Sequence, residues 1–133
     1  MAGQYRTSTD LITETLANLG VLAAGQSIDP EDFNYVTAKL DPTIRKLAAL
    51  DIVWIADQNN IPGAFFSDLA DILAGECATK FGATPDDAIK LTNKGLGAPP
   101  PLGQGVGSGA AAMSLKQMLR GRATGEVVYS EFI

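Results

Sequence analysis

The stretch DIVWIADQNNIPGAFFSDLADILAGECATKFG, residues 51–82, decides the fold of this chain. Its second half repeats large apolar residues at the spacing of one broad helix face, and these are Phe65, Phe66, Leu69, Ile72, Leu73, Cys77 and Phe81. Small residues lie between them, so a neighbouring helix can approach closely. Gly82 follows at the point where a helix end favours a left-handed residue. The stretch therefore predicts the central helix of a small bundle.

Two helices are expected before this stretch. Ser8 or Thr9 can cap the first, which ends at Gly20. Asp29 followed by Pro30 is typical of the cap and first residue of the second helix. The apolar face of that second helix is formed by Phe33, Val36, Leu40, Ile44 and Leu47.

Three further signals refine this prediction. Pro42 lies inside the second helical pattern, so we expect a kink there or two helices end to end. The segment DIVWIA, too short to assign, is interpreted as an irregular turn that packs Trp54. Thr84 followed by Pro85 predicts the start of a short fourth helix, which ends at Gly95.

The C-terminal part of the chain differs in composition. Residues 95–109 hold six glycines and three prolines, which predicts a linker that is stiff at 99–101 and loose at 103–109. Ser114 can then cap a short helix. Residues 127–133, VVYSEFI, alternate as a β-strand does but have no hairpin partner nearby. Strand addition to a partner would suit such a segment, and a disordered or self-docked tail is the alternative.

Together these patterns predict an all-α fold. A bundle of about four helices occupies residues 1–94, a Gly/Pro-rich linker residues 95–111, and an extended C-terminal docking arm, with a possible added β-strand, residues 112–133. A chain of 133 residues fits this single helical body.

The charge of the chain limits its partners. The formal net charge is −5 and the sequence pI about 4.5, with no basic stripe that would favour nucleic-acid binding. An acidic surface can still line a path through which DNA slides, because it repels phosphates. The region 112–133 differs, since it carries a net charge of +1. No secretory signal pattern and no apolar run of membrane-spanning length are present, so we expect no membrane association.

The residues for common catalytic chemistry are missing. The chain has no histidine and one cysteine, which excludes Ser-His-Asp and Cys-His catalysis and four-cysteine metal sites. The glycines of 103–110 follow prolines instead of a strand, so they do not predict a nucleotide site. The acidic pairs at 31–32 and 86–87 suit the first turns of helices. Glu14 and Glu76 are the remaining candidates for a raised carboxyl pKa. We therefore expect no enzyme activity, no cofactor and no metal.

The order of these features is similar to that of the head-to-tail adaptor proteins of tailed bacteriophages, which include tail accessory factors and head-tail connectors. The resemblance is carried by NLGVLAAGQSIDPEDF at 18–33, LDPTIRKLAAL at 40–50 and IPGAFFSDLADILAGECATKFG at 61–82. It covers roughly residues 8–94 and an extended C-terminal arm. The Gly/Pro-rich segment 95–111 departs from the family pattern.

The resemblance implies a structural virion protein that lies at the neck of the particle and is present in the host cytoplasm during assembly. It would form a ring, usually of twelve copies, beneath the portal protein and above a downstream tail or nozzle protein, and DNA would pass through the lumen without specific binding. The arm would dock on the portal through Lys116, Arg120, Arg122, Val127, Val128, Tyr129, Phe132 and Ile133. Core and ring packing would use Phe33, Val36, Leu40, Ile44, Leu47, Trp54, Phe65, Phe66, Leu69, Leu73 and Phe81.

Two alternatives belong to other classes. Some members of that family are credited with a cell-wall hydrolase activity, and a glycan hydrolase would need a cleft with two carboxyl groups about 5–9.5 Å apart. A non-viral cytosolic helical binding module would instead be a monomer or dimer whose arm is dispensable. Lys116, Arg120 and Arg122 would then be solvated cations.

Overall fold

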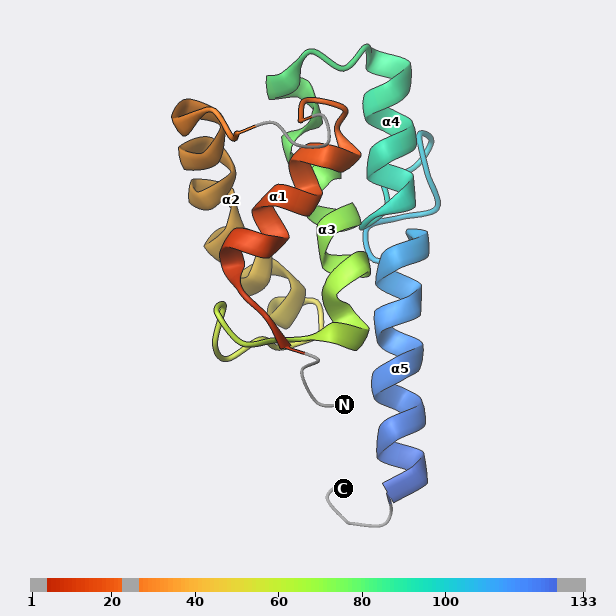
Figure 1. Ribbon diagram of the computed structural model, residues 1–133. Coiled ribbons are helices and arrows are strands. Elements are labelled where there is room, and N and C mark those ends of the chain that lie inside the picture. The colour runs from red at the N-terminus through yellow and green to blue at the C-terminus, as the bar shows by residue number, and fades with distance from the viewer. Residues whose placement is uncertain (1–4, 23–26, 127–133) are drawn as a thin grey trace.

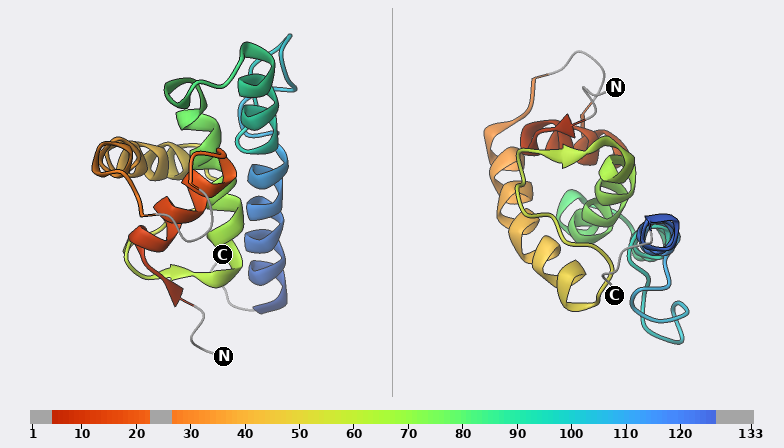
Figure 2. Two further views of the ribbon diagram at one scale, coloured as in Figure 1. Left: turned by 45° about the horizontal axis from the view of Figure 1, so that its top comes forward. Right: turned by 90° about the horizontal axis from the view of Figure 1, so that it is seen from below.

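The helix predicted from the central stretch, α3 (Gly63–Cys77), lies at the centre of the structure (Figure 1). The computed structural model describes residues 5–22 and 27–126, and within these it contains five α-helices. The other four, α1 (Ser8–Asn18), α2 (Pro30–Ala49), α4 (Pro85–Lys94) and α5 (Ala110–Glu126), all contact α3. Figure 1 and Figure 2 show α4 and α5 one above the other along one side of α3, with α2 on the other side. The predicted all-α fold is confirmed, and its fifth helix, α5, contains the short helix expected after the Gly/Pro-rich segment.

The predicted core residues lie where their spacing placed them, with one exception. The buried ones are Val36, Leu40, Ile44, Leu47, Phe65, Phe66, Leu69 and Leu73. Phe33 and Phe81 are half-buried and pack against this core. Trp54 is the exception, because 64% of its surface is exposed. Its neighbours Val53 and Ile55 are buried, and side chains alternate between opposite sides of extended backbone, so the indole faces outward.

The predicted helix boundaries at the middle of the chain are confirmed. Asp29 caps α2, where its carboxylate accepts a hydrogen bond from the backbone N–H of Glu31 at 2.9 Å. The Thr84 hydroxyl accepts one from the N–H of Asp87 at 3.2 Å and so caps α4. A short 3-10 helix, η1 (Ala78–Phe81), extends α3 and ends at Gly82, whose φ is +84°. However, α2 runs through Pro42 as one helix, so the alternative of two separate helices is wrong.

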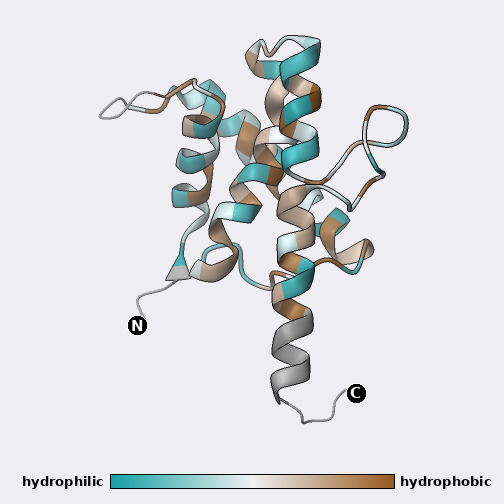
Figure 3. Cartoon of the chain, turned by 90° about the vertical axis from the view of Figure 1, so that its right-hand side faces the viewer, coloured by the Kyte–Doolittle hydropathy of each residue, from teal (hydrophilic) through white to brown (hydrophobic). Residues whose placement is uncertain are grey.

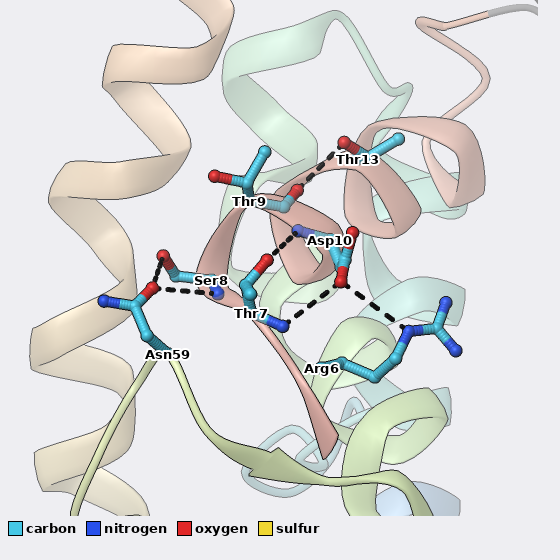
Figure 4. Close-up of polar contacts among 7 residues, drawn as sticks. All are labelled: Arg6, Thr7, Ser8, Thr9, Asp10, Thr13 and Asn59. Atoms are coloured by element: carbon cyan, nitrogen blue, oxygen red, sulfur yellow. Dashed lines mark hydrogen bonds and ion pairs between the residues drawn. The ribbon is translucent and has the colours of Figure 1, made fainter. Parts of the chain in front are cut away.

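The first helix begins earlier than predicted, at a set of polar contacts shown in Figure 4. Thr7 is the cap instead of Ser8 or Thr9: its hydroxyl accepts from the Asp10 N–H, and the Asp10 carboxylate accepts from the Thr7 N–H, each at 3.2 Å. The Asn59 side-chain oxygen accepts from the Ser8 hydroxyl at 2.7 Å. The Ser8–Asn59 contact is possible because β1 (Tyr5–Arg6) pairs antiparallel with β2 (Ile61–Pro62), which brings the 57–60 loop beside the helix start.

We predict that Thr7→Ala lowers the free energy of unfolding by about 1 kcal/mol, because the substitution removes the capping hydroxyl from α1. Urea unfolding followed by circular dichroism measures this loss. Thr9→Ala is the matched control, since the side chain of Thr9 is exposed and caps no helix. We expect this control to change the free energy of unfolding by no more than about 0.5 kcal/mol. Equal losses in the two variants would contradict the capping role of Thr7.

Candidate functional site

The Gly/Pro-rich segment is a closed loop instead of a loose linker. The Leu96 carbonyl accepts hydrogen bonds from the N–H groups of Gly107 at 2.8 Å and Gly109 at 3.0 Å. The N–H of Gly105 donates to the carbonyl of Ala98 at 2.8 Å. Leu96 and Ala98 are themselves buried. The predicted looseness of residues 103–109 is therefore wrong, because these glycines allow the backbone to pair with itself.

Three glycines of this loop, Gly95, Gly97 and Gly109, form a junction at which backbones meet without side chains between them. A Cβ on Gly95 would lie 2.8 Å from the carbonyl oxygen of Asp71 in α3. A Cβ on Gly97 would lie 2.7 Å from the Gly109 nitrogen, and a Cβ on Gly109 would collide with the Gly95 carbonyl oxygen. We call these residues the glycine junction. It holds the end of α4 and the start of α5 together against α3.

We predict that Gly109→Ala lowers the free energy of unfolding by about 1–3 kcal/mol, since a methyl group at this position forces backbone to move. Thermal or urea unfolding measures the change. Ala110→Ser, which also adds one heavy atom but at the exposed neighbouring residue, serves as the control and stays within about 0.5 kcal/mol. A neutral Gly109→Ala variant would show that the junction tolerates a side chain.

The first part of the predicted docking arm belongs to the helical body. The helix α5 begins at Ala110, so Ser114 is not its cap, and Ala111, Ala112 and Leu115 lie in the core. The Lys116 ammonium donates a hydrogen bond to the Gly107 carbonyl at 3.2 Å. The boundary predicted at residue 112 is therefore wrong, because this apolar face packs on α3.

Beyond these contacts, α5 extends past the other helices (Figure 1). Arg120 and Arg122 lie within this helix. The remaining predicted docking residues, Val127, Val128, Tyr129, Phe132 and Ile133, lie outside the described residues. The structure therefore places Lys116 on the body and tests none of the proposed contacts with a portal.

An open groove, which the sequence did not predict, lies between α5 and the turn that follows α2. Two adjoining hollows of about 470 and 230 Å³ form it. They are lined by Ala48, Leu50, Asp51, Ile52, Val53, Trp54, Lys116 and Leu119. Figure 3 shows the side of the molecule on which the end of α2 lies beside α5. We call this feature the Trp54 groove, after its most exposed apolar side chain.

The turn beneath the Trp54 groove is unusual in its backbone. Asp51 has a φ of +57°, a left-handed conformation that aspartate adopts more readily than most residues. Its N–H donates to the Ala48 carbonyl at 3.0 Å, and the N–H of Ile52 donates to the Leu47 carbonyl at 2.9 Å. The chain thus leaves α2 sharply, burying Ile52 while leaving Trp54 exposed.

The carboxylate with a raised pKa is one that the sequence did not single out. Burial raises the pKa of Asp71, and the nearby Asp68 and Glu14 add to the rise, while Lys94 opposes it. The Asp71 carboxylate lies 3.7 Å from the Lys94 ammonium and accepts a hydrogen bond from the Asn18 amide at 3.3 Å. It therefore joins α3 to α1 and α4. Glu76, predicted as a candidate, forms an ion pair with Lys46 at 3.2 Å.

Two further findings concern metals and membranes. Within the described residues, no group of three or more His, Cys, Asp or Glu side chains is arranged to hold a metal ion. None of the helices in residues 5–22 and 27–126 combines the length and apolar character that a membrane span requires.

The single cysteine is buried on α3. Burial raises the pKa of the Cys77 thiol to about 11, so little thiolate forms at neutral pH. The residue therefore acts as a small apolar member of the core.

We predict that iodoacetamide modifies Cys77 in the native protein at pH 8 at least about 100-fold more slowly than in the urea-unfolded chain, since each pKa unit lowers the thiolate fraction about tenfold. Mass spectrometry measures the rate without ambiguity, because the chain has one cysteine. Similar rates in the two states would contradict a buried thiol.

Comparison of the chain with models of known protein families, with curated proteins and with solved structures finds no match. The resemblance to head-to-tail adaptors therefore rests on the sequence pattern alone.

Proposed function

We propose that this chain is a structural adaptor of a tailed bacteriophage particle. It would form a ring beneath the portal, joining the capsid to the tail and continuing the DNA channel. The observation that supports this proposal best is the arrangement of α5, which the glycine junction fixes to the body and which then projects past the other helices (Figure 1). A projecting helix of fixed direction suits a protein that connects one ring to another.

The proposed mechanism uses repetition. Each copy would contribute a modest contact, and ring symmetry would make about twelve such contacts simultaneous, so the whole assembly binds far more tightly than one arm. Residues 1–98 carry thirteen acidic and seven basic residues, so a ring of such bodies would repel the DNA that passes through it. The portal protein above and a tail or nozzle protein below are the proposed partners.

The proposed portal contact uses only part of the arm predicted from the sequence. Lys116 donates a hydrogen bond to the Gly107 carbonyl and Leu119 packs against the core, so we propose that the portal contact lies beyond Leu119. Arg120, Arg122 and residues 127–133 remain the proposed docking residues.

We predict that the full chain co-elutes with a candidate portal ring in many copies, and that a chain ending at Glu126 does not. Light scattering after size exclusion measures the mass of each complex. This truncation keeps the whole of α5. Leu102→Ser, at an exposed loop residue, controls for general loss of apolar surface.

The other outcomes have definite meanings. Binding that persists without residues 127–133 would contradict arm docking and move the contact to the helical body. Failure of the full chain to bind would contradict the adaptor role for that pairing.

A further inference from the structure

The Trp54 groove has the composition of a binding surface. The indole of Trp54 is 64% exposed although both neighbours in the chain are buried, and Leu50 beside it is 38% exposed. Tryptophan is enriched among the residues that anchor protein–protein contacts, and grouped exposed apolar side chains often mark such contacts. The floor is apolar, since Ile52 and Val53 are buried there.

The same chain contains an apolar segment that suits this groove. Residues 127–133 read VVYSEFI, with two aromatic and three aliphatic residues in seven. They directly follow α5, the helix whose Leu119 lines the groove. We propose that residues 127–133 of one copy of this chain lie in the Trp54 groove of a second copy.

The geometry of α5 favours a second copy over the same one. From Leu119 the helix continues to Glu126, seven residues further, which carries the chain about 10 Å beyond the groove. For residues 127–133 to enter the groove of their own copy, the chain would have to reverse its direction after Glu126 and run back along α5. In a second copy no reversal is needed, and all seven residues, about 23 Å when extended, can lie in the groove.

Polar groups at the groove add one specific contact. Lys116 lines it and uses one ammonium proton on the Gly107 carbonyl, so two donors remain for the Glu131 carboxylate of the incoming segment. Asp51 lines the same hollow, so the groove offers one charge of each sign. The contact is thus mainly apolar, and Tyr129, which shares a face of the extended segment with Glu131, would pack on the indole of Trp54.

Such an exchange has a consequence for assembly. The segment and the groove are different surfaces, so each copy gives one and receives one, and the contact repeats into a closed ring or an open chain. The exchange needs no portal and belongs to the free protein, whereas docking on a portal would require the same residues 127–133 to leave the groove. The exchange is measured on the free protein alone, so its failure and a failure of portal binding are distinguished by separate measurements.

The experiment uses Trp54 as its own probe, because it is the only tryptophan of the chain. Emission excited selectively at tryptophan and mass by light scattering are recorded over a range of concentrations, for the full chain and for the chain ending at Glu126. The inference predicts a blue shift of the emission that grows with concentration together with mass in the full chain, and neither change in the truncated chain. Adding the peptide VVYSEFI to the truncated chain restores the blue shift without raising the mass to that of the oligomer.

Two substitutions distinguish self-association through the Trp54 groove from association through other exposed apolar residues. Trp54→Ala weakens self-association at least about 30-fold, as expected of an interface anchor, whereas Leu102→Ser, equally apolar and 57% exposed but outside the groove, leaves it unchanged. A monomer at all concentrations would overturn the proposal. A blue-shifted emission in a monomeric full chain would also overturn it, since the segment would then occupy its own groove.

Discussion

The close approach of backbones at the glycine junction determines how α4, the 95–109 loop and α5 pack on α3. At Gly95, Gly97 and Gly109 the end of α4, the loop and the start of α5 approach so closely that a single methyl group has no room. Because of this approach, α5 leaves the body in one direction and packs Leu115 on α3. The helix α5, which a flexible linker would leave independent of the bundle, therefore contributes side chains to the core.

This constraint also creates the groove. With α5 fixed beside the turn that follows α2, Leu119 and Lys116 form one wall and Ile52 the floor. The sharp exit of the chain at Asp51 then leaves Trp54 at the edge. The projecting end of α5 and the Trp54 groove are therefore two products of one packing arrangement, which places a donor segment and an acceptor surface on the same molecule.

The sequence predicted those parts of the fold that depend on local patterns. The apolar spacing of 63–81, the cap at Asp29, the cap at Thr84 and the left-handed Gly82 all appear as expected, because each is set by residues within one or two turns. The prediction made from the glycine content of residues 95–109 was wrong, because glycine is found both in flexible linkers and at sites of close backbone packing. In 95–109 it indicated looseness, but here it permits close backbone approach, which depends on residues of α3 that are distant in sequence.

The candidate site was less predictable for the same reason. The interpretation of DIVWIA as a turn that packs Trp54 is wrong in this respect, since its neighbours Val53 and Ile55 take the inward positions. Asp71 gains its raised pKa from burial among three helices, and no spacing along α3 alone reveals that environment. The groove joins residues 48–54 to residues 116–119, and only the packing of α5 brings these together.

Amide hydrogen exchange in the native protein tests the central claim most directly, namely that the glycine junction makes α5 part of the body. We expect the N–H groups of Gly107 and Gly109, which donate to the Leu96 carbonyl, to exchange as slowly as amides near the ends of α3, together with those of the Leu115 turn. Exchange of these amides at the rate of an unstructured chain, while α3 stays protected, would contradict it and restore a flexible linker.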